Sequence, residues 1–372
     1  MGPAHILHLH STFSLGGKEA RAVRIINDLG DAVRHTIVSA MPDALGAREA
    51  IDPGVSADFP RDAPPLAGRP GPGRFRALAA YMRRFDLVLT YNWGALDGVM
   101  AHRLGGRGLP PIIHHEDGFN ADEAERLKPT RNLYRRLAFP TLARLVVPSR
   151  RLETIAREVW KQPEERVARI ANGIAVDRYA DPEPGAIPGF ARREGEIVIG
   201  TVAGLRAVKD LPRLVRAVAQ LSTPARLVIV GEGPERDAIA AEAERCDIAG
   251  RLVMPGFLDR PWRYVGLFDI FALSSHSEQF PISLVEAMAA GQPVAAPDVG
   301  DVAAMVATEN RSLIGSDLVA SLDKLARDAD LRASLGAANR AKARAEFDER
   351  RMLVEYRRLY GSALGNSERF AR

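Results

Sequence analysis

The chain is poor in cysteine and contains no long apolar run. Its 372 residues include one cysteine, Cys246, so no disulfide can form within the chain and a reducing compartment is expected. No apolar stretch approaches the ~18–20 residues that span a bilayer, so no transmembrane helix is expected. The first ten residues show no charged segment followed by an apolar one, so no signal peptide is expected. These absences predict a cytoplasmic protein.

The signatures of several ligand classes are also missing. The first glycine-rich turn, Gly16-Gly17, lacks the G-x-G-x-x-G spacing of dinucleotide-binding folds, which speaks against a nicotinamide oxidoreductase. His114 and His115 are not joined by a second histidine or cysteine cluster at ligand spacing, so no metal site is expected. No nucleic-acid motif accompanies the basic residues, so no nucleic-acid partner is expected.

What the chain does contain is enough apolar material for about two globular domains. Hydrophobic residues make up 46% and charged residues 26%, which is typical of a soluble protein. The net charge of +4 is uneven, because residues 126–169 hold twelve Lys or Arg and only four Asp or Glu. This basic segment is either a solvated helix face or a patch that faces anionic lipid headgroups. The inner face of the cytoplasmic membrane is therefore a candidate partner.

Short apolar runs alternate with helical patterns along the whole chain, which predicts an α/β fold of two doubly wound, Rossmann-like halves. The first half has predicted strands at 5–9, 35–39, 87–90, 111–114 and 145–147, and helices at 18–29, 74–84, 95–104 and 131–139. The second half has predicted strands at 197–202, 226–230, 252–253, 269–273 and 293–296, and helices at 210–221, 235–245 and 281–290. The expected domains are 1–180 and 196–350, joined by a Pro/Gly-rich linker at 181–195, with a C-terminal helix at 351–372 that is expected to pack back on the first domain.

Two glutamates eight residues apart, Glu278 and Glu286, are the most informative local feature. The second lies inside the predicted helix 281–290, and the first lies in the polar loop before it. Pro281 is tolerated in a first helical turn, and Gly291 is a plausible stop. The start of this helix is an anion site, because free N–H groups and the helix dipole point there. Carboxylates beside an anion site suit a ligand that also carries hydroxyls, such as a sugar or a ribose.

Further candidates follow other predicted strands. Arg206 and Lys209 come after the first strand of the second half, where two cations suit a diphosphate. The glycines of Gly16-Gly17 and of Gly231-Glu232-Gly233 either form tight turns or let a phosphate approach the backbone. Because strand residues alternate between faces, only one of His114 and His115 is expected to face a cleft.

These motifs, in this order, resemble family 4 retaining glycosyltransferases of the GT-B fold, especially members tied to bacterial exopolysaccharide or cell-surface polysaccharide assembly. The likeness covers nearly the whole chain. It is carried by Gly16-Gly17 with Glu19, Val147-Pro148-Ser149, Asn172-Gly173 onward, Gly231-Glu232-Gly233-Pro234, the Glu278 to Gly291 run, Asp298-Val299-Gly300 and the closing helix with Tyr356 and Tyr360.

The resemblance implies a role for each matching residue. Glu286 would hold the ribose of a UDP- or GDP-sugar, Glu278 would contact the donor sugar, and Arg206 and Lys209 would neutralise the leaving diphosphate. His114, with His115 as the alternative, would be the histidine near the transferred sugar. The remaining implied donor contacts are Gly16, Gly17, Gly204, Glu232, Phe280, Pro281 and Ile282.

Two departures from the family pattern matter. The family places an arginine five residues before the lysine, where this chain has Gly204, and Arg206 lies three before it. Gln279 stands where glycine is frequent. The resemblance implies metal-independent transfer, with retention of configuration, to a glycan or lipid-linked glycan. A catalytically inert GT-B scaffold that binds nucleotide or a partner protein is the alternative.

Overall fold

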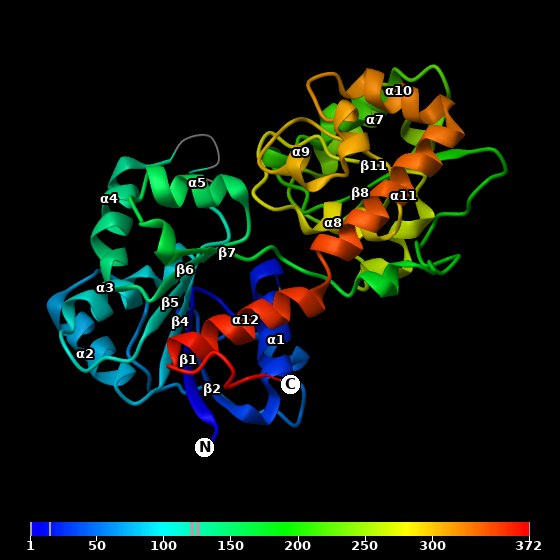
Figure 1. Cartoon of the computed structure of the whole chain (residues 1–372). Helices are drawn as coiled ribbons and strands as arrows, with labels where there is room; N and C mark the ends of the chain where they lie inside the picture. The colour runs from blue at the N-terminus through cyan, green and yellow to red at the C-terminus, as the bar shows by residue number, and fades with distance from the viewer. Residues whose placement is uncertain (1, 15, 120–122, 124–126, 372) are drawn as a thin grey trace. The chain divides into compact units, whose positions relative to one another are not determined.

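The computed structural model describes residues 2–14, 16–119, 123 and 127–371 (Figure 1). Leu15 of the first glycine loop and Arg126 of the basic segment lie outside these residues. The chain divides into two compact units. The first contains Met1–Asn172 and Arg351–Arg372, and the second contains Gly173–Arg350. Each unit has one wholly parallel sheet with helices, so the predicted α/β class is confirmed.

The first unit is built on a seven-stranded sheet in the order β3-β2-β1-β4-β5-β6-β7. Five of the strands were predicted, and the short edge strands β3 and β7 were not. The bounds are β1 Ala4–His10, β2 Val33–Ser39, β3 Ala57–Asp58, β4 Leu87–Tyr91, β5 Ile112–His115, β6 Arg144–Val147 and β7 Val167–Arg169.

Helices cover both faces of this sheet, as expected of a parallel sheet. One face packs against α2 (Pro72–Met82), α3 (Leu96–Leu104), α4 (Pro129–Ala138) and α5 (Arg150–Glu158). The other packs against α1 (Gly17–Leu29) and α12 (Glu349–Ala363), which lie side by side in Figure 1. The last helix belongs to this unit because Met352, Tyr356 and Tyr360 are buried in its core.

The second unit is built on a five-stranded sheet in the order β10-β9-β8-β11-β12. All five strands were predicted. Their bounds are β8 Ile197–Val202, β9 Ala225–Val230, β10 Leu252–Gly256, β11 Ile270–Ala272 and β12 Val294–Ala295. The helices are α6 Leu211–Ala219, α7 Arg236–Arg245, α8 Ile282–Ala289, α9 Val302–Met305, α10 Leu318–Arg327 and α11 Ala329–Glu346.

The segment 181–195 is part of the second unit, which corrects its prediction as a linker. Ile187 is 1% exposed. The Arg226 guanidinium donates to the carbonyl of Ala191 at 3.2 Å and lies 5.6 Å from the ring centre of Phe190. The Pro/Gly-rich composition therefore describes a coil that packs on its own domain, and the division between the units falls earlier, after Asn172.

Candidate functional site

Two loops meet at the carboxyl edge of the second sheet. One follows β8 and the other follows its neighbour β11. The backbone N–H of His276 donates to the carbonyl of Val208 at 2.9 Å, and the Ser274 hydroxyl donates to the carbonyl of Lys209 at 2.9 Å. Ligands of open parallel sheets bind at this edge, where the loops of adjacent strands converge.

The joined loops bring Lys209 and Glu278 together. The Lys209 Nζ lies 2.5 Å from the Glu278 Oε1, and the Ser275 hydroxyl donates to the same oxygen at 2.7 Å. The side chain of Glu278 is 7% exposed and that of Lys209 is 17% exposed. A buried carboxylate that accepts from two donors is held in one orientation.

Glycines allow this edge to be packed so closely. A Cβ at Gly300, whose φ is +60°, would lie 2.0 Å from the carbonyl oxygen of Glu278. A Cβ at Gly231, whose φ is +145°, would lie 1.9 Å from the carbonyl oxygen of Ala203. In both places only glycine combines the left-handed backbone with the close approach. These two glycines of the family-like motifs therefore shape the loops that carry Glu278 and Arg206.

Arg206 is exposed, and its side chain folds back over Gly204. A Cβ at Gly204 would lie 3.4 Å from the Arg206 Nε and 3.9 Å from its Nη2. The Arg206 guanidinium thus occupies the space next to Gly204 into which a side chain at position 204 would extend. The departure from the family pattern leaves a guanidinium in the same neighbourhood.

Helix α8 begins at Ile282, directly after the Glu278 loop, with no side-chain cap at Pro281. The Phe280 ring packs edge-on against Phe347, with centres 5.8 Å apart. Glu286 lies one turn into the helix and is half-buried. Burial, and next the carboxylate of Glu286, raise the pKa of the Tyr264 phenol, which places this tyrosine close to Glu286.

Glu232 follows β9 and is half-exposed. Its carboxylate accepts from the Arg236 guanidinium at 3.1 Å on the following helix, α7. The backbone carbonyl of Glu232 accepts from the N–H of Leu205 at 2.9 Å, so this residue also holds the loop after β8.

In the first unit, Gly16 and Gly17 lie at the start of α1, after β1. Gly16 is the N-cap residue, and open space surrounds the position of a Cβ at Gly17. Lys18, which was not predicted, adds a cation to this loop. Its ammonium donates to the Thr12 carbonyl at 3.2 Å and pairs with Glu19. An exposed glycine backbone beside a lysine at a helix start is suited to an anion.

His114, which the resemblance implies lies near the transferred sugar, is buried in this structure. The ring is 0% exposed, its Nδ1 lies 2.7 Å from the Thr90 hydroxyl, and its Nε2 lies 3.5 Å from Glu116. His115, the alternative, is 1% exposed on the other face, with its Nε2 3.0 Å from the Tyr360 hydroxyl. Because helices cover both faces of β5, alternation buries both histidines in this structure.

A polar cluster at the carboxyl edge of the first sheet was missed by the sequence analysis. The Arg21 guanidinium of α1 is 3% exposed and forms a bidentate pair with Asp117, which follows β5. It also donates to the side chain of Asn172 at 2.9 Å. These residues are 96 and 151 positions apart from Arg21, so no local pattern joins them.

Two protein-family models and several known proteins match this chain. The model described as Glycosyltransferase Family 4 matches residues 4–178, and the model described as Glycosyl transferases group 1 matches residues 186–342. The 2-deoxystreptamine glucosyltransferase of Streptomyces kanamyceticus is 27% identical over 60% of this chain and 61% of its own. The N-acetyl-alpha-D-glucosaminyl L-malate synthase of Bacillus anthracis is 26% identical over 46% and 47%. The match thus spans about half to three fifths of these curated relatives.

Among solved structures, HepE of Anabaena in complex with UDP superposes with a TM-score of 0.79, at 18% identity, over 96% of this chain and 100% of that chain. This likeness shows the fold, and the two family models cover one unit each. The chain belongs to the family 4 glycosyltransferases and has the GT-B fold.

Proposed function

We propose that this chain transfers a sugar, with retention of configuration and without a metal, from a nucleoside-diphosphate sugar to a glycan or lipid-linked glycan. The observation that carries the proposal is the Lys209–Glu278 pair, with an Nζ to Oε1 distance of 2.5 Å, at the carboxyl edge of the second sheet. Such a donor has an anionic diphosphate, which a cation can bind, and sugar hydroxyls, which can donate to a carboxylate. The pair presents both groups side by side.

The diphosphate gains negative charge as the glycosidic bond breaks. Lys209, the Arg206 guanidinium over Gly204 and the uncapped start of α8 supply positive charge at one edge of the sheet. Donors fixed before the reaction stabilise this charge without reorganising, which is the largest contribution in many enzymes. In this proposal the three together take the role that a divalent cation has elsewhere.

Glu286 is proposed to hold the ribose hydroxyls. Its carboxylate is half-buried in α8, and it is close enough to Tyr264 to raise the pKa of that phenol. A half-buried carboxylate is a strong acceptor for two adjacent hydroxyls. Both UDP and GDP carry such a ribose. The solved complexes of HepE contain UDP and UDP-glucose, so UDP-sugars are the first donors to test.

Retention is proposed to proceed by front-face attack, in which the leaving phosphate takes the proton of the acceptor hydroxyl. Retaining glycosidases instead use a free carboxylate nucleophile about 5 Å from an acid. Glu278 is poorly suited to be that nucleophile, because Lys209 and Ser275 both bind one of its oxygens. Its proposed role is to orient the donor sugar.

The basic segment is proposed to dock on an anionic membrane surface. Leu133 and Leu137, one turn apart on α4, are each 56% exposed. Lys128, at the N-cap of this helix, and Arg136, within it, are also exposed. Apolar side chains framed by cations suit an interface with acidic headgroups, where a lipid-linked acceptor would be found. None of the helices that the structure describes is long and apolar enough to cross a membrane.

The test is release of nucleoside diphosphate from a panel of UDP- and GDP-sugars, with and without saccharide acceptors, followed by NMR of the anomeric linkage in the product. The proposal expects release from at least one donor, unchanged by EDTA, and a product with the donor's anomeric configuration. Nucleotide binding without release from any donor would favour an inert scaffold instead.

A further inference from the structure

A row of three rings lies across the first unit's sheet, on the face that α1 and α12 cover. His10 ends β1, Tyr91 ends β4 and His115 ends β5, and these strands are neighbours in the sheet. The ring centres are 4.0 Å apart between His10 and Tyr91 and 4.6 Å apart between Tyr91 and His115, with interplanar angles of 11° and 12°. Each residue is at most 1% exposed. Two imidazoles are therefore stacked in the interior at the carboxyl ends of the central strands.

The C-terminal helix α12 shields one end of this row from water. The hydroxyl of Tyr360 lies 3.0 Å from the Nε2 of His115. The ring centre of His115 is 5.9 Å from that of Tyr356 and 6.0 Å from that of Tyr360, and both tyrosines are 0% exposed. If α12 left the sheet, water would reach the imidazole of His115.

The hydrogen bonds of His115 fit an uncharged ring. Its Nδ1 lies 3.2 Å from the backbone carbonyl of Thr90, which can only accept, so Nδ1 carries the proton. In the neutral ring Nε2 is then an acceptor, and the Tyr360 hydroxyl donates to it. A second proton would occupy Nε2 and end this hydrogen bond between the sheet and α12.

The charges around His115 also oppose a second proton. Burial, and next the guanidinium of Arg21 on α1, hold the pKa of His115 well below its usual range. The nearby carboxylate, Asp117, is already engaged in a bidentate pair with Arg21. The other ionisable groups that face His115 are histidines and tyrosines: His10 on β1, Tyr91 on β4, His114 on its own strand, and Tyr356 and Tyr360 on α12. Burial raises the pKa of each of these three tyrosines, so they supply no negative charge.

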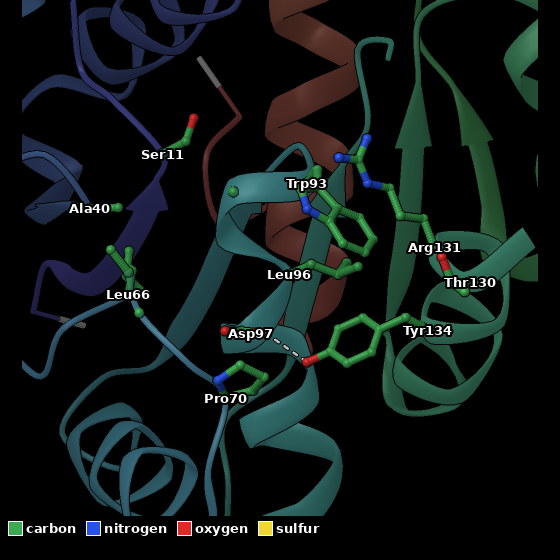
Figure 2. Close-up of a pocket in the computed structure, with 13 residues that line it drawn as sticks. Ser11, Ala40, Leu66, Pro70, Trp93, Leu96, Asp97, Thr130, Arg131 and Tyr134 are labelled. Atoms are coloured by element: carbon green, nitrogen blue, oxygen red, sulfur yellow. Dashed lines mark hydrogen bonds between the residues drawn. The ribbon is translucent and has the colours of Figure 1, made fainter. Parts of the chain in front are cut away.

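The strands that α12 covers continue into the turns at the carboxyl edge of the sheet. Ser11 follows His10, Trp93 lies two residues after Tyr91, and both line a cavity of about 530 Å³ (Figure 2). Asn92, between Tyr91 and Trp93, has a φ of +55°, and its side chain accepts from the N–H of Asp117 at 2.7 Å. The docking of α12 therefore supports the strand ends from which these turns emerge.

We propose that α12 is a pH-sensitive switch, docked on the sheet while the His115 ring is neutral and released when this ring takes up a proton. In the released state His115 is in water and binds a proton at its usual pKa of about 6.5. Docking is therefore independent of pH above about 7, and below about 6.5 it weakens about tenfold for each pH unit. The inference depends on the packing of the first unit alone, so it can hold or fail whether or not the chain transfers a sugar.

The experiment is hydrogen–deuterium exchange of the full chain, read by mass spectrometry between about pH 7.5 and 5, with each rate divided by the intrinsic rate at that pH. His115→Gln keeps a donor and an acceptor but cannot bind a proton. Tyr360→Phe removes the hydroxyl and keeps the ring. His102→Gln is the matched control, because His102 is a half-buried histidine of α3, on the opposite face of the sheet. Melting temperatures check that the variants fold.

In the parent chain the opening constant of α12 should rise about tenfold per pH unit below about pH 6.5, and peptides of β4 should open less often at every pH. His102→Gln should behave as the parent, and His115→Gln should show no rise. Tyr360→Phe should open about fivefold more often at neutral pH, because one hydrogen bond is lost, and should keep the rise.

The inference is overturned if the opening of α12 in the parent does not increase as the pH falls, or if α12 opens only together with β4. It is also overturned if the rise is as steep in His115→Gln as in the parent, or if His102→Gln abolishes it. The first two outcomes need only the parent chain, so they decide the matter even if His115→Gln does not fold.

Discussion

The Nζ of Lys209 lies 2.5 Å from the Oε1 of Glu278, a residue 69 positions later in the chain. The two side chains follow adjacent strands, β8 and β11, and each is largely removed from solvent. Removing either side chain would leave the other as an unpaired buried charge, which costs several kcal/mol of stability. The pair therefore fixes the position of two residues that are proposed to meet the donor.

The position of Glu278 depends on Gly300. In Gly300→Ala the new Cβ would meet the carbonyl oxygen of Glu278 at 2.0 Å, at a φ of +60°. Backbone strain alone should cost about 1–3 kcal/mol, and the loop must also shift. We expect a lower melting temperature and weaker donor turnover. Gly250→Ala is the control, since open space surrounds that position. Equal melting curves and turnover for the two variants would contradict this account.

Arg206 is expected to serve as the arginine that the family has at the position of Gly204. Arg206→Ala should lower kcat for donor turnover by about 10²–10³, the usual cost of losing one donor to developing charge. Adding Gly204→Arg to this variant should restore most of the loss, because the Arg206 side chain already lies next to Gly204. Steady-state kinetics measure kcat for both variants. A double variant as slow as Arg206→Ala would contradict the proposal that Arg206 takes the role of the family's arginine.

Much of the fold follows from the sequence because its signals are local. Ten of the twelve strands in the described residues were predicted from short apolar runs, and the other two, β3 and β7, are short edge strands. Helix α5 (Arg150–Glu158) was not predicted, although Ser149 caps it by accepting from the N–H of Leu152 at 3.1 Å. The segment 181–195 was read as a linker because composition does not reveal that Ile187 is buried.

The site was predictable where residues follow adjacent strands, and less so elsewhere. Lys209 and Glu278 meet because β8 and β11 are neighbours, a strand order that was not predicted; only the family resemblance implied that the two residues share a site. The burial of His114 was missed because the rule of alternation assumes one open face, whereas both faces of β5 are covered. The pair of Arg21 with Asp117 depends on where α1 packs, which no local pattern contains.

Stability of the first unit should fall as the pH drops below about 6.5. The Nε2 of His8 lies 2.9 Å from the Nδ1 of His35, and both rings are buried. Burial lowers the pKa of His8 well below its usual value and, with the charge of His5, lowers the pKa of His35 to about 3. Below about pH 6.5 these two histidines bind protons in the unfolded chain but stay neutral in the folded chain. Each histidine therefore lowers the free energy of unfolding by about 1.4 kcal/mol per pH unit.

Urea unfolding between pH 7.5 and 4.5 measures this slope. His35→Leu should reduce the slope of the free energy of unfolding against pH by the contribution of one histidine. Above pH 7 the buried histidines should contribute nothing to this slope. His276→Gln is the control for the loss of a histidine, because His276 is exposed and belongs to the second unit. Parallel pH profiles for the parent and His35→Leu would show that the buried histidines are not responsible.

Binding to membranes should depend on the exposed face of α4. The double variant Leu133→Ser, Leu137→Ser should lose most of its co-sedimentation with vesicles that contain acidic phospholipid. Leu104→Ser is the control, since Leu104 is 63% exposed on α3, outside the basic segment. Raising the salt concentration should release the parent chain, because screening weakens attraction to the headgroups. Binding that ignores both the substitutions and the salt would contradict the proposed surface.

The most direct test of the central proposal is donor turnover by Lys209→Ala and Glu286→Ala, measured as nucleoside diphosphate released from the best donor. Lys324→Ala is the control for a lost lysine, because Lys324 is exposed on α10 of the same unit. The account predicts that Lys209→Ala loses about 10²–10³ in kcat, that Glu286→Ala binds donor and free nucleotide weakly, and that Lys324→Ala behaves as the parent. Turnover in Lys209→Ala and Glu286→Ala equal to that of the parent would show that this edge of the second sheet is not the donor site.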